Sequence, residues 1–319
     1  MSTKQETAGS SVSDQRGFPT TSPPGWSGAV LGDVSARSWL RRLTADETRE
    51  ISAAVSSVGR DDLGRPVVDR STFVLPTLAE EAAAWRSEIE SGRGFLVLRG
   101  LPVSTWSEEE SEIAFLGLGS HLGLPQPQNA EGDLVAHVRA DRSEDDPSAR
   151  RYETREDTPF HTDGADVIAL FCLRQARSGG RSAVVSSVEV LNRVHAARPD
   201  LTSLLFEPWP FAMTVDASQH FESPLMESTG RFSFSYIRWY IEQSQALPDA
   251  PRLTAGHLEL MDLIDAAAEN ARLDIDLAPG DIQILSNRSV MHARSTFEDW
   301  PEPERRRHLL RLWLQLGER

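Results

Sequence analysis

The chain has 319 residues, which is long for one ordinary domain and short for two complete ones. Acidic residues outnumber basic ones by 48 to 33, and the formal net charge of −15 argues against a nucleic-acid groove or an anionic membrane surface as the main partner. The single cysteine, Cys172, cannot form an internal disulfide, and the sequence shows no secretory signal, so a cytoplasmic protein is expected. No apolar run approaches the roughly 20 residues of a membrane span, so no membrane crossing is expected.

Residues 1–25 are rich in Ser, Thr, Gly and Pro and predict a flexible tail, followed by one folded domain over 26–319. Several helix starts then show a capping-box pattern, in which a hydroxyl residue precedes an acid by three positions. The pairs are Thr44 with Glu47, Thr77 with Glu80, Ser107 with Glu110 and Ser186 with Glu189. A further, longer helix is expected around 254–272.

Strands are expected between and after these helices. An apolar run bounded by glycines predicts a buried strand over 92–101, and shorter strands are expected at 273–277 and 282–287. The last strand, 307–316, alternates between two faces. One face carries Leu310, Leu312, Leu314 and Leu316, and the other carries Arg307, Leu309, Arg311, Trp313 and Gln315. Early helices followed by a strand-rich half predict a mixed α+β fold, with a β-sandwich or barrel and helices packed outside it.

The strongest chemical signal is the segment Phe160-His161-Thr162-Asp163. In a strand, residues two apart share a face, so His161 and Asp163 would present an imidazole and a carboxylate together. Such a pair suits a divalent metal, although it also occurs by chance in many proteins. His292 follows a probable strand and is a candidate third ligand. Two histidines and one carboxylate leave three open metal positions, which is the facial triad of non-haem Fe(II) oxygenases.

Arginines on the final strand add a second element. Arg311 lies 19 residues after His292, and burying an arginine among leucines is costly unless an anion meets it. A dicarboxylate cosubstrate would be such an anion, held through a bidentate guanidinium contact. Arg307 lies on the same face of the strand. The alternative is that each arginine forms an internal salt bridge.

Four segments, in this order, resemble the TauD/TfdA family of Fe(II)- and 2-oxoglutarate-dependent dioxygenases in the clavaminate-synthase-like group. They are PFHTDG (159–164), SGGRS (178–182), APGDIQILSNRSVMHAR (278–294) and ERRRHLLRLWL (304–314). The resemblance runs from about Gly92 to Leu316. It implies a double-stranded β-helix, or jelly roll, with flanking helices.

The resemblance also implies site residues. His161, Asp163 and His292 match the iron ligands. Arg311 matches the arginine that binds the distal carboxylate of 2-oxoglutarate, and Ser182 matches a hydroxyl residue, often Thr in the family, that helps to hold it. Arg307 matches an arginine near the metal-chelating end of the cosubstrate or near the primary substrate.

The activity implied is abstraction of hydrogen from a small molecule, with O2 as second cosubstrate and release of succinate and CO2. Hydroxylation of an amino acid or a natural-product intermediate of secondary metabolism is the leading expectation. Desaturation, cyclisation and epimerisation begin with the same step and stay open. Halogenation is disfavoured because related halogenases replace the carboxylate of Asp163 with a small residue.

Substrate-binding residues are harder to identify. Tyr236 and Arg238 are two apart and would share a strand face, where Arg238 could bind a substrate carboxylate. Three further candidates are Gln128, Arg294 and Tyr152. Gln128 lies where related enzymes place polar substrate contacts, and Arg294 lies two residues past His292 and would either face the site or brace it. Tyr152 belongs to the charged stretch 139–158, which is either a surface loop or a mobile lid.

Two other classes of protein use some of the same features. A metal-dependent hydrolase would use the same three ligands to activate water, but it has no need of paired arginines. A non-catalytic jelly-roll protein would bind 2-oxoglutarate or another carboxylate, but it has no need of three open metal positions. The sequence does not predict the oligomeric state.

Overall fold

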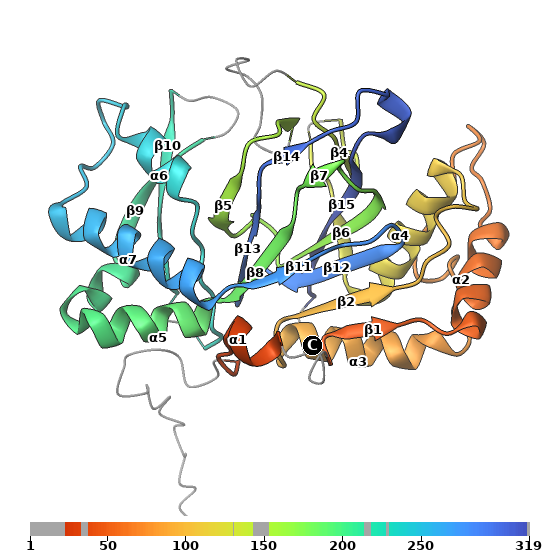
Figure 1. The fold of residues 1–319 in the computed structure, drawn as a ribbon, viewed down its shortest axis with the longest axis horizontal. Coiled ribbons are helices and arrows are strands. Elements are labelled where there is room, and N and C mark those ends of the chain that lie inside the picture. Colours follow the sequence, from red (N-terminus) through yellow and green to blue (C-terminus); the bar gives the residue numbers. More distant parts are fainter. Residues whose placement is uncertain are drawn as a thin grey trace, which may run out of the picture.

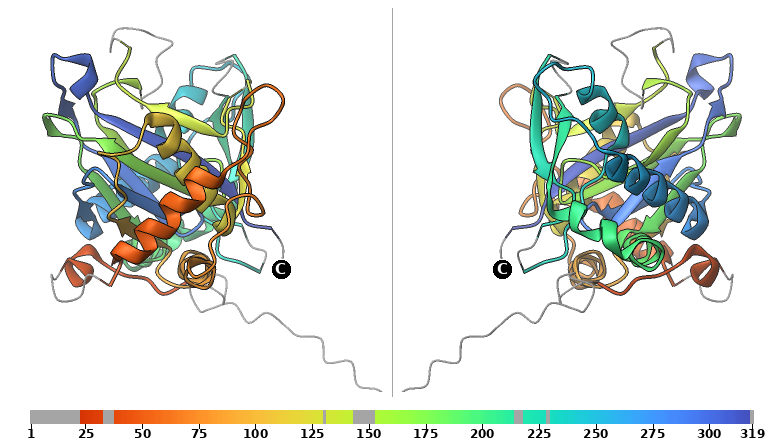
Figure 2. Two further views of the ribbon diagram at one scale, coloured as in Figure 1. Left: turned by 90° about the vertical axis from the view of Figure 1, so that its right-hand side faces the viewer. Right: turned by 90° about the vertical axis from the view of Figure 1, so that its left-hand side faces the viewer.

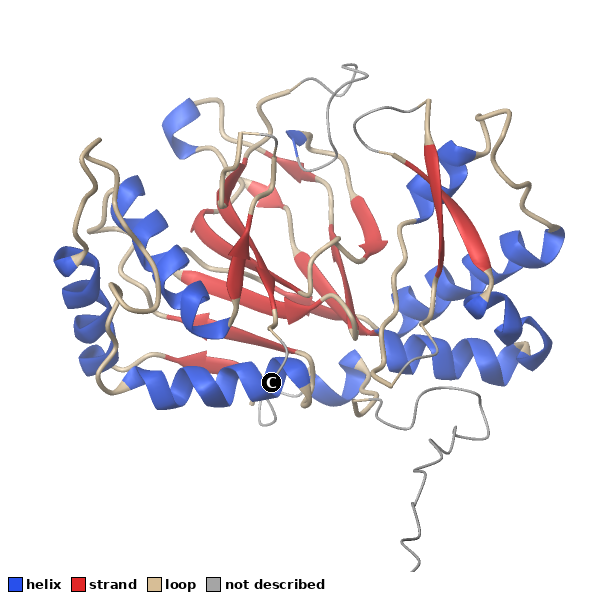
Figure 3. Ribbon diagram, turned by 180° about the vertical axis from the view of Figure 1, so that it is seen from behind, coloured by secondary structure: helices blue, strands red, loops and turns tan. Residues whose placement is uncertain are grey.

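The computed structural model describes residues 23–32, 38–129, 131–142, 153–213, 218–227 and 230–317. Most of the predicted tail, residues 1–22, therefore lies outside the described residues. Figures 1 and 3 show the strands in the middle of the molecule, with helices at both ends and below. None of the helices in the described ranges combines the length and apolarity that a membrane crossing requires.

Two sheets form the centre. The larger is mostly antiparallel and consists of β1 (Leu40–Arg42), β2 (Phe95–Arg99), β12 (Asp281–Ser286), β6 (Val167–Arg174), β15 (His308–Gln315) and β3 (Leu124–Gln126), with β4 (Val135–Val138) also paired to β15. The smaller contains β11 (Leu273–Ile275), β8 (Ser182–Ser186), β13 (Val290–Arg294) and β5 (Thr158–His161). Two antiparallel two-stranded sheets accompany them, β9 (Pro208–Ala212) with β10 (His220–Pro224) and β7 (Ser178–Gly179) with β14 (Phe297–Glu298).

The two sheets face each other across a shared apolar core. Val97, Ile168 and Leu285 from the larger sheet pack in one cluster with Val184 and Leu273 from the smaller. Burying one face of each sheet against the other is what holds a sandwich or jelly roll together. The predicted mixed α+β jelly-roll fold is confirmed.

Helices cover the outer faces in two groups, which Figure 2 shows from opposite sides. The first group is α2 (Ala45–Ser57), α3 (Leu78–Glu90) and α4 (Glu108–Leu122), and the second is α5 (Ser187–Ala197), α6 (Arg238–Ser244) and α7 (Ala255–Ala271). Shorter helices within the described ranges are α1 (Gly28–Leu31), η3 (Pro199–Phe206) and η4 (Pro303–Arg305). Leu310, Leu312 and Leu314 pack with the first group, whereas Leu309 faces the inter-sheet core, so the predicted alternation of the last strand is confirmed.

The helix caps follow the sequence with one exception. Thr44 and Ser107 both form complete capping boxes, and Ser186 accepts a hydrogen bond from the Glu189 N–H. The predicted box at Thr77 is wrong. Glu50 of α2 takes its place, since its carboxylate accepts from the Thr77 hydroxyl and from the first backbone N–H groups of α3. An anion from another helix satisfies the same orphan donors that a local cap would.

Candidate metal centre

The smaller sheet brings three candidate ligands together. His161 ends β5, and His292 lies directly opposite it on β13. Asp163 follows β5 after one intervening residue. Its Oδ1 is 4.0 Å from Nε2 of His161, and its Oδ2 is 4.0 Å from Nε2 of His292. The ligand atoms of the three residues all lie within 4.8 Å of one another.

The donor set fits a divalent metal. At 4.0 Å the carboxylate is too far from either imidazole for a hydrogen bond. Two donors that share one ion, at about 2.1 Å each, can be separated by up to about 4.2 Å. Nδ1 of His161 lies 2.8 Å from the carbonyl oxygen of Pro159 and therefore carries the proton, which leaves Nε2 with its lone pair toward Asp163.

Protonation favours metal binding as well. Burial by itself raises the pKa of Asp163, but the neighbouring His292, Arg311 and His161 outweigh it and keep the pKa below the ordinary value. Burial, together with His161, lowers the pKa of His292 to about 3. At neutral pH the site therefore presents a carboxylate and a neutral imidazole, which are the forms that ligate metals.

The predicted cosubstrate residues lie on the inner face of the sheets. Arg311 is buried, and its Nε donates to Oε1 of Gln128 at 2.7 Å, while Nε2 of Gln128 donates to the Arg311 carbonyl at 2.7 Å. Ser182 is buried and donates to Oε1 of Gln283 at 2.7 Å. Gln128 therefore holds Arg311 in place.

Arg307 is buried in a different environment. Its Nη1 has no hydrogen-bond partner among the described residues, and burial lowers its pKa to about 10. Its guanidinium carbon lies 5.1 Å from the ring centre of Phe297. A Cβ at Gly180 would lie 3.2 Å from its Nε, so the glycine gives the arginine room. A buried guanidinium group with an unsatisfied N–H is an incomplete anion site.

Tyr236 and Arg238 do not have the arrangement predicted for substrate binding. Arg238 begins helix α6, so the two do not share a strand face. The Tyr236 side chain is fully buried, and its hydroxyl donates to Asp265 at 3.0 Å. Arg238 forms ion pairs with Glu242, Asp262 and Asp265. The contacts with Asp262 and Asp265 tie both side chains to α7, whereas Glu242 lies in α6 itself, and they indicate a structural role for both side chains.

Of the three other substrate candidates, Gln128 is the residue that holds Arg311. Arg294 donates to the carbonyl oxygens of Thr154 and Glu156, so it braces the segment that leads into β5. Tyr152 lies outside the described residues, as does most of the candidate lid at 139–158.

Three residues around the metal centre were missed by sequence reasoning. Trp239 places its ring 4.9 Å from that of His161, edge to face, and Trp313 donates from Nε1 to Oδ2 of Asp163 at 3.4 Å. Asn287 accepts from the backbone N–H of Asp163 at 3.0 Å. Trp313 shares its strand face with Arg311, which is a usable sequence signal, whereas nothing local points to Trp239.

A second cluster of possible ligands, Glu108, His137 and His308, does not suit a metal. Nδ1 of His308 faces a guanidinium N–H of Arg174 at 3.2 Å and must accept, because guanidinium groups only donate. Nε2 of His308 then carries the proton and donates to Nδ1 of His137 at 2.9 Å. Neither nitrogen of the buried histidine is left for a metal.

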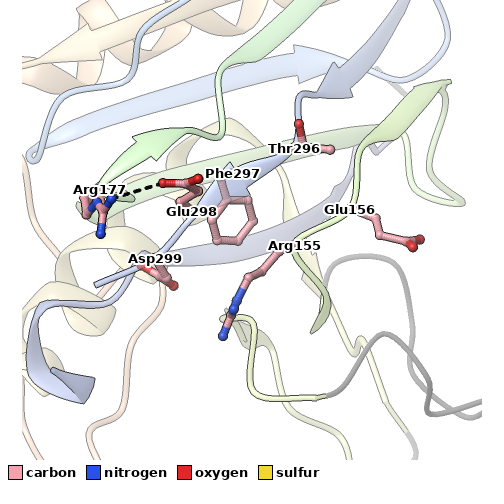
Figure 4. Close-up of a pocket in the computed structure, with 7 residues that line it drawn as sticks. All are labelled: Arg155, Glu156, Arg177, Thr296, Phe297, Glu298 and Asp299. Carbon is pink, nitrogen blue, oxygen red and sulfur yellow. Dashed lines mark ion pairs between the residues drawn. The ribbon is translucent and has the colours of Figure 1, made fainter. Parts of the chain in front are cut away.

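A surface hollow of about 560 Å³ lies at β7 and β14 and is separate from the metal centre (Figure 4). Its walls carry both charges, and Arg177 and Glu298 form an ion pair across 3.3 Å. The Phe297 ring, which lies against Arg307, also lines this hollow. None of the three candidate ligands contributes to it.

Comparison with known proteins identifies the family to which this chain is similar. The model of the family described as "Taurine catabolism dioxygenase TauD, TfdA family" matches residues 60–313. A taurine hydroxylase-like protein, SAT17, of Stachybotrys chartarum is 30% identical over 286 residues, which cover 85% of this chain and 73% of that protein. FR-33289 synthase of Streptomyces rubellomurinus is 27% identical over 311 residues, covering 93% and 91%.

Solved structures share the fold. Asparagine oxygenase in complex with Fe(II), 2S,3S-3-hydroxyasparagine and succinate has a TM-score of 0.67 and 18% identity, covering 87% of this chain and 93% of that one. The non-heme iron oxygenase OrfP in complex with Fe and alpha-ketoglutaric acid has a TM-score of 0.64 and 15% identity, covering 87% and 94%.

Proposed function

The chain belongs to the TauD/TfdA family of dioxygenases and is a 2-oxoglutarate-dependent non-haem iron oxygenase, and we propose that it hydroxylates a small molecule at an iron ion held by His161, Asp163 and His292. The observation that carries this assignment is the buried face formed by these three donors. Membership of the family argues against the hydrolase and the non-catalytic binding protein.

A bound Fe(II) ion would supply the redox chemistry, in which decarboxylation of 2-oxoglutarate with O2 is coupled to abstraction of hydrogen from the substrate. The chain's own residues then have three tasks. The neutral imidazoles and the anionic Asp163 hold the ion on one face and leave the opposite positions open. Trp239, on α6, packs edge to face against His161 and limits the movement of that imidazole. The cationic side chains hold anionic groups in a fixed orientation.

For the cosubstrate we propose that Arg307 and Ser182 hold the distal carboxylate of 2-oxoglutarate, and that Arg311 acts nearer the metal. This exchanges the two arginine roles expected from the sequence. Arg311 is close enough to Asp163 to lower its pKa, whereas Arg307 lies four residues earlier, just before β15 begins. Gly180, two residues before Ser182, packs against Arg307. If 2-oxoglutarate binds with one end at the three ligands, its distal carboxylate would need a cation away from Asp163, which favours Arg307.

The primary substrate is proposed to be an amino acid or a related natural-product intermediate. The names of the related proteins and the ligands of the solved structures, hydroxyasparagine and hydroxyarginine, support this class. Arg311, held in place by Gln128, would meet an anionic group such as a carboxylate. Mass spectrometry of the product separates hydroxylation, which adds oxygen, from desaturation or cyclisation, which removes hydrogen. The protein is proposed to act in the cytoplasm, because its buried Cys172 is a free thiol, as expected in reducing surroundings.

The proposal is tested by anaerobic titration of the Fe(II)-loaded chain with 2-oxoglutarate. A visible metal-to-ligand charge-transfer band is expected, and His161→Ala should abolish it. Absence of the band in the unaltered chain would refute the function. Arg307→Ala should weaken 2-oxoglutarate binding by at least about 30-fold, because truncating a buried charge partner costs about 2–5 kcal/mol. A larger loss for Arg311→Ala than for Arg307→Ala would restore the roles expected from the sequence.

A further inference from the structure

Asp163 is not held by strand pairing. His161 and His292 are fixed by the β5–β13 ladder, but β5 ends at His161 and the next strand, β6, begins only at Val167. The carboxylate that faces both imidazoles therefore sits on a connecting segment. Metal ligands need an orientation fixed within a fraction of an ångström, and partners behind them usually provide it.

Asn287 makes three hydrogen bonds to that segment. Its Oδ1 accepts from the Asp163 backbone N–H at 3.0 Å, and its Nδ2 donates to the Ala165 carbonyl at 2.9 Å. Its backbone N–H donates to the Asp166 carbonyl at 3.0 Å. Asn287 is 4% exposed, so water does not compete strongly for these bonds.

The location of Asn287 links the two halves of the metal centre. It follows β12 and lies in the turn that leads into β13, the strand that carries His292. Its side chain reaches a segment 124 residues earlier in the chain. The turn that places one imidazole is thereby tied to the loop that places the carboxylate, while Trp313 holds the carboxylate itself through Oδ2.

We infer that Asn287 is a positioning residue for the metal centre. It fixes the backbone of Asp163 so that the two carboxylate oxygens face His161 and His292. The inference rests on the proposed function, because it assumes that the three residues bind a metal. Asn287 itself does not touch the ion.

Arg288 is a matched control in the same turn. Its guanidinium donates to Oδ1 of Asp166 at 3.1 and 2.7 Å, so its removal loosens the same turn and the same segment. No hydrogen bond or ion pair joins it to Asp163 within the described part of the chain. A purely structural contribution of this turn would affect both variants alike.

The test is titration of the metal-free full chain with Co(II), followed through its d–d absorption, with thermal unfolding of each metal-free variant measured alongside. Asn287→Ala should lower Co(II) affinity by about 10- to 100-fold. Arg288→Ala should stay within about twofold of the unaltered chain, because it leaves the orientation of Asp163 intact. If Asn287→Ala does not fold, Asn287→Asp keeps the shape and the acceptor but loses the Ala165 donor, and a roughly two- to tenfold loss is expected.

Unchanged affinity in the Asn287 variants would overturn the inference, and so would equal losses in Asn287→Ala and Arg288→Ala. Failure of the unaltered chain to bind Co(II) at all would instead overturn the proposed function, and the inference with it. The two failures are therefore distinguishable by the behaviour of the unaltered chain.

Discussion

His308 makes the stability of this protein depend on pH. Its side chain is completely buried, and burial, together with the positive charges of Arg139 and Arg174, lowers its pKa to about 3. Those two guanidinium groups approach Nδ1 at 3.3 and 3.2 Å, and His137 bonds to Nε2. Glu108, at 3.6 Å, is the one carboxylate within ion-pair distance among the residues described. The folded state therefore keeps His308 neutral.

The magnitude follows from the difference between the two states. In the unfolded chain His308 has its ordinary pKa of about 6.5, so between pH 6.5 and 3 only the unfolded state takes up this proton. Its stabilising contribution is complete above pH 6.5 and is lost as the pH falls, at about 1.4 kcal/mol per pH unit. Lowering the pH from 7 to 5 should therefore cost about 2 kcal/mol through His308 alone.

The assay is urea unfolding of metal-free chain and of His308→Gln at pH 7 and pH 5. Gln keeps an acceptor for the guanidinium groups and cannot titrate. The unaltered chain should lose about 2 kcal/mol more than the variant between these pH values. Using metal-free protein in both cases makes the titration of His292 a shared contribution that cancels. An equal loss in the two proteins would refute the buried neutral state of His308.

Three further outcomes are expected. Tyr236→Phe removes a hydroxyl that contacts Asp265 and the Met261 carbonyl of α7, and it should lower the free energy of unfolding by about 1 kcal/mol. The 2-oxoglutarate charge-transfer band should stay unchanged, and its loss would show that Tyr236 contributes to the active site. Gly117→Ala in α4 should destabilise the folded chain by about 1–3 kcal/mol in thermal unfolding, because a Cβ there would lie 2.3 Å from the Phe73 ring. Ala has the better helix propensity, so a stabilised variant would contradict this packing. Trp313→Phe keeps an aromatic ring beside Arg311 but loses the hydrogen bond to Asp163. It should weaken Co(II) binding by roughly two- to tenfold, and unchanged Co(II) binding would contradict a role for this bond.

A local sequence pattern predicted the structure correctly where the interaction that forms it is also local. The capping boxes at Thr44 and Ser107 formed because cap and acid lie three residues apart. Thr77 shows the same pattern and failed, because Glu50, 27 residues earlier, accepts from the Thr77 N–H that the Glu80 side chain would otherwise bond. The predicted shared strand face of Tyr236 and Arg238 is wrong for a related reason, since a period of two was assumed where a helix begins.

The sequence by itself determined which chemical groups are available: a His-x-Asp pair, a later histidine and two arginines on one face of a strand whose alternation fixes that face. Its pattern of helices and strands also predicted a sandwich or barrel with helices outside it, and the resemblance to the family narrowed this prediction to a jelly roll. Only the tertiary structure decided how these groups are arranged. It left Arg307 with a buried, unsatisfied N–H, tied Arg311 to Gln128 across 183 residues, and tied Asp163 to Asn287 across 124. Such long-range contacts depend on how strands and turns pack in space, and no local periodicity records that packing.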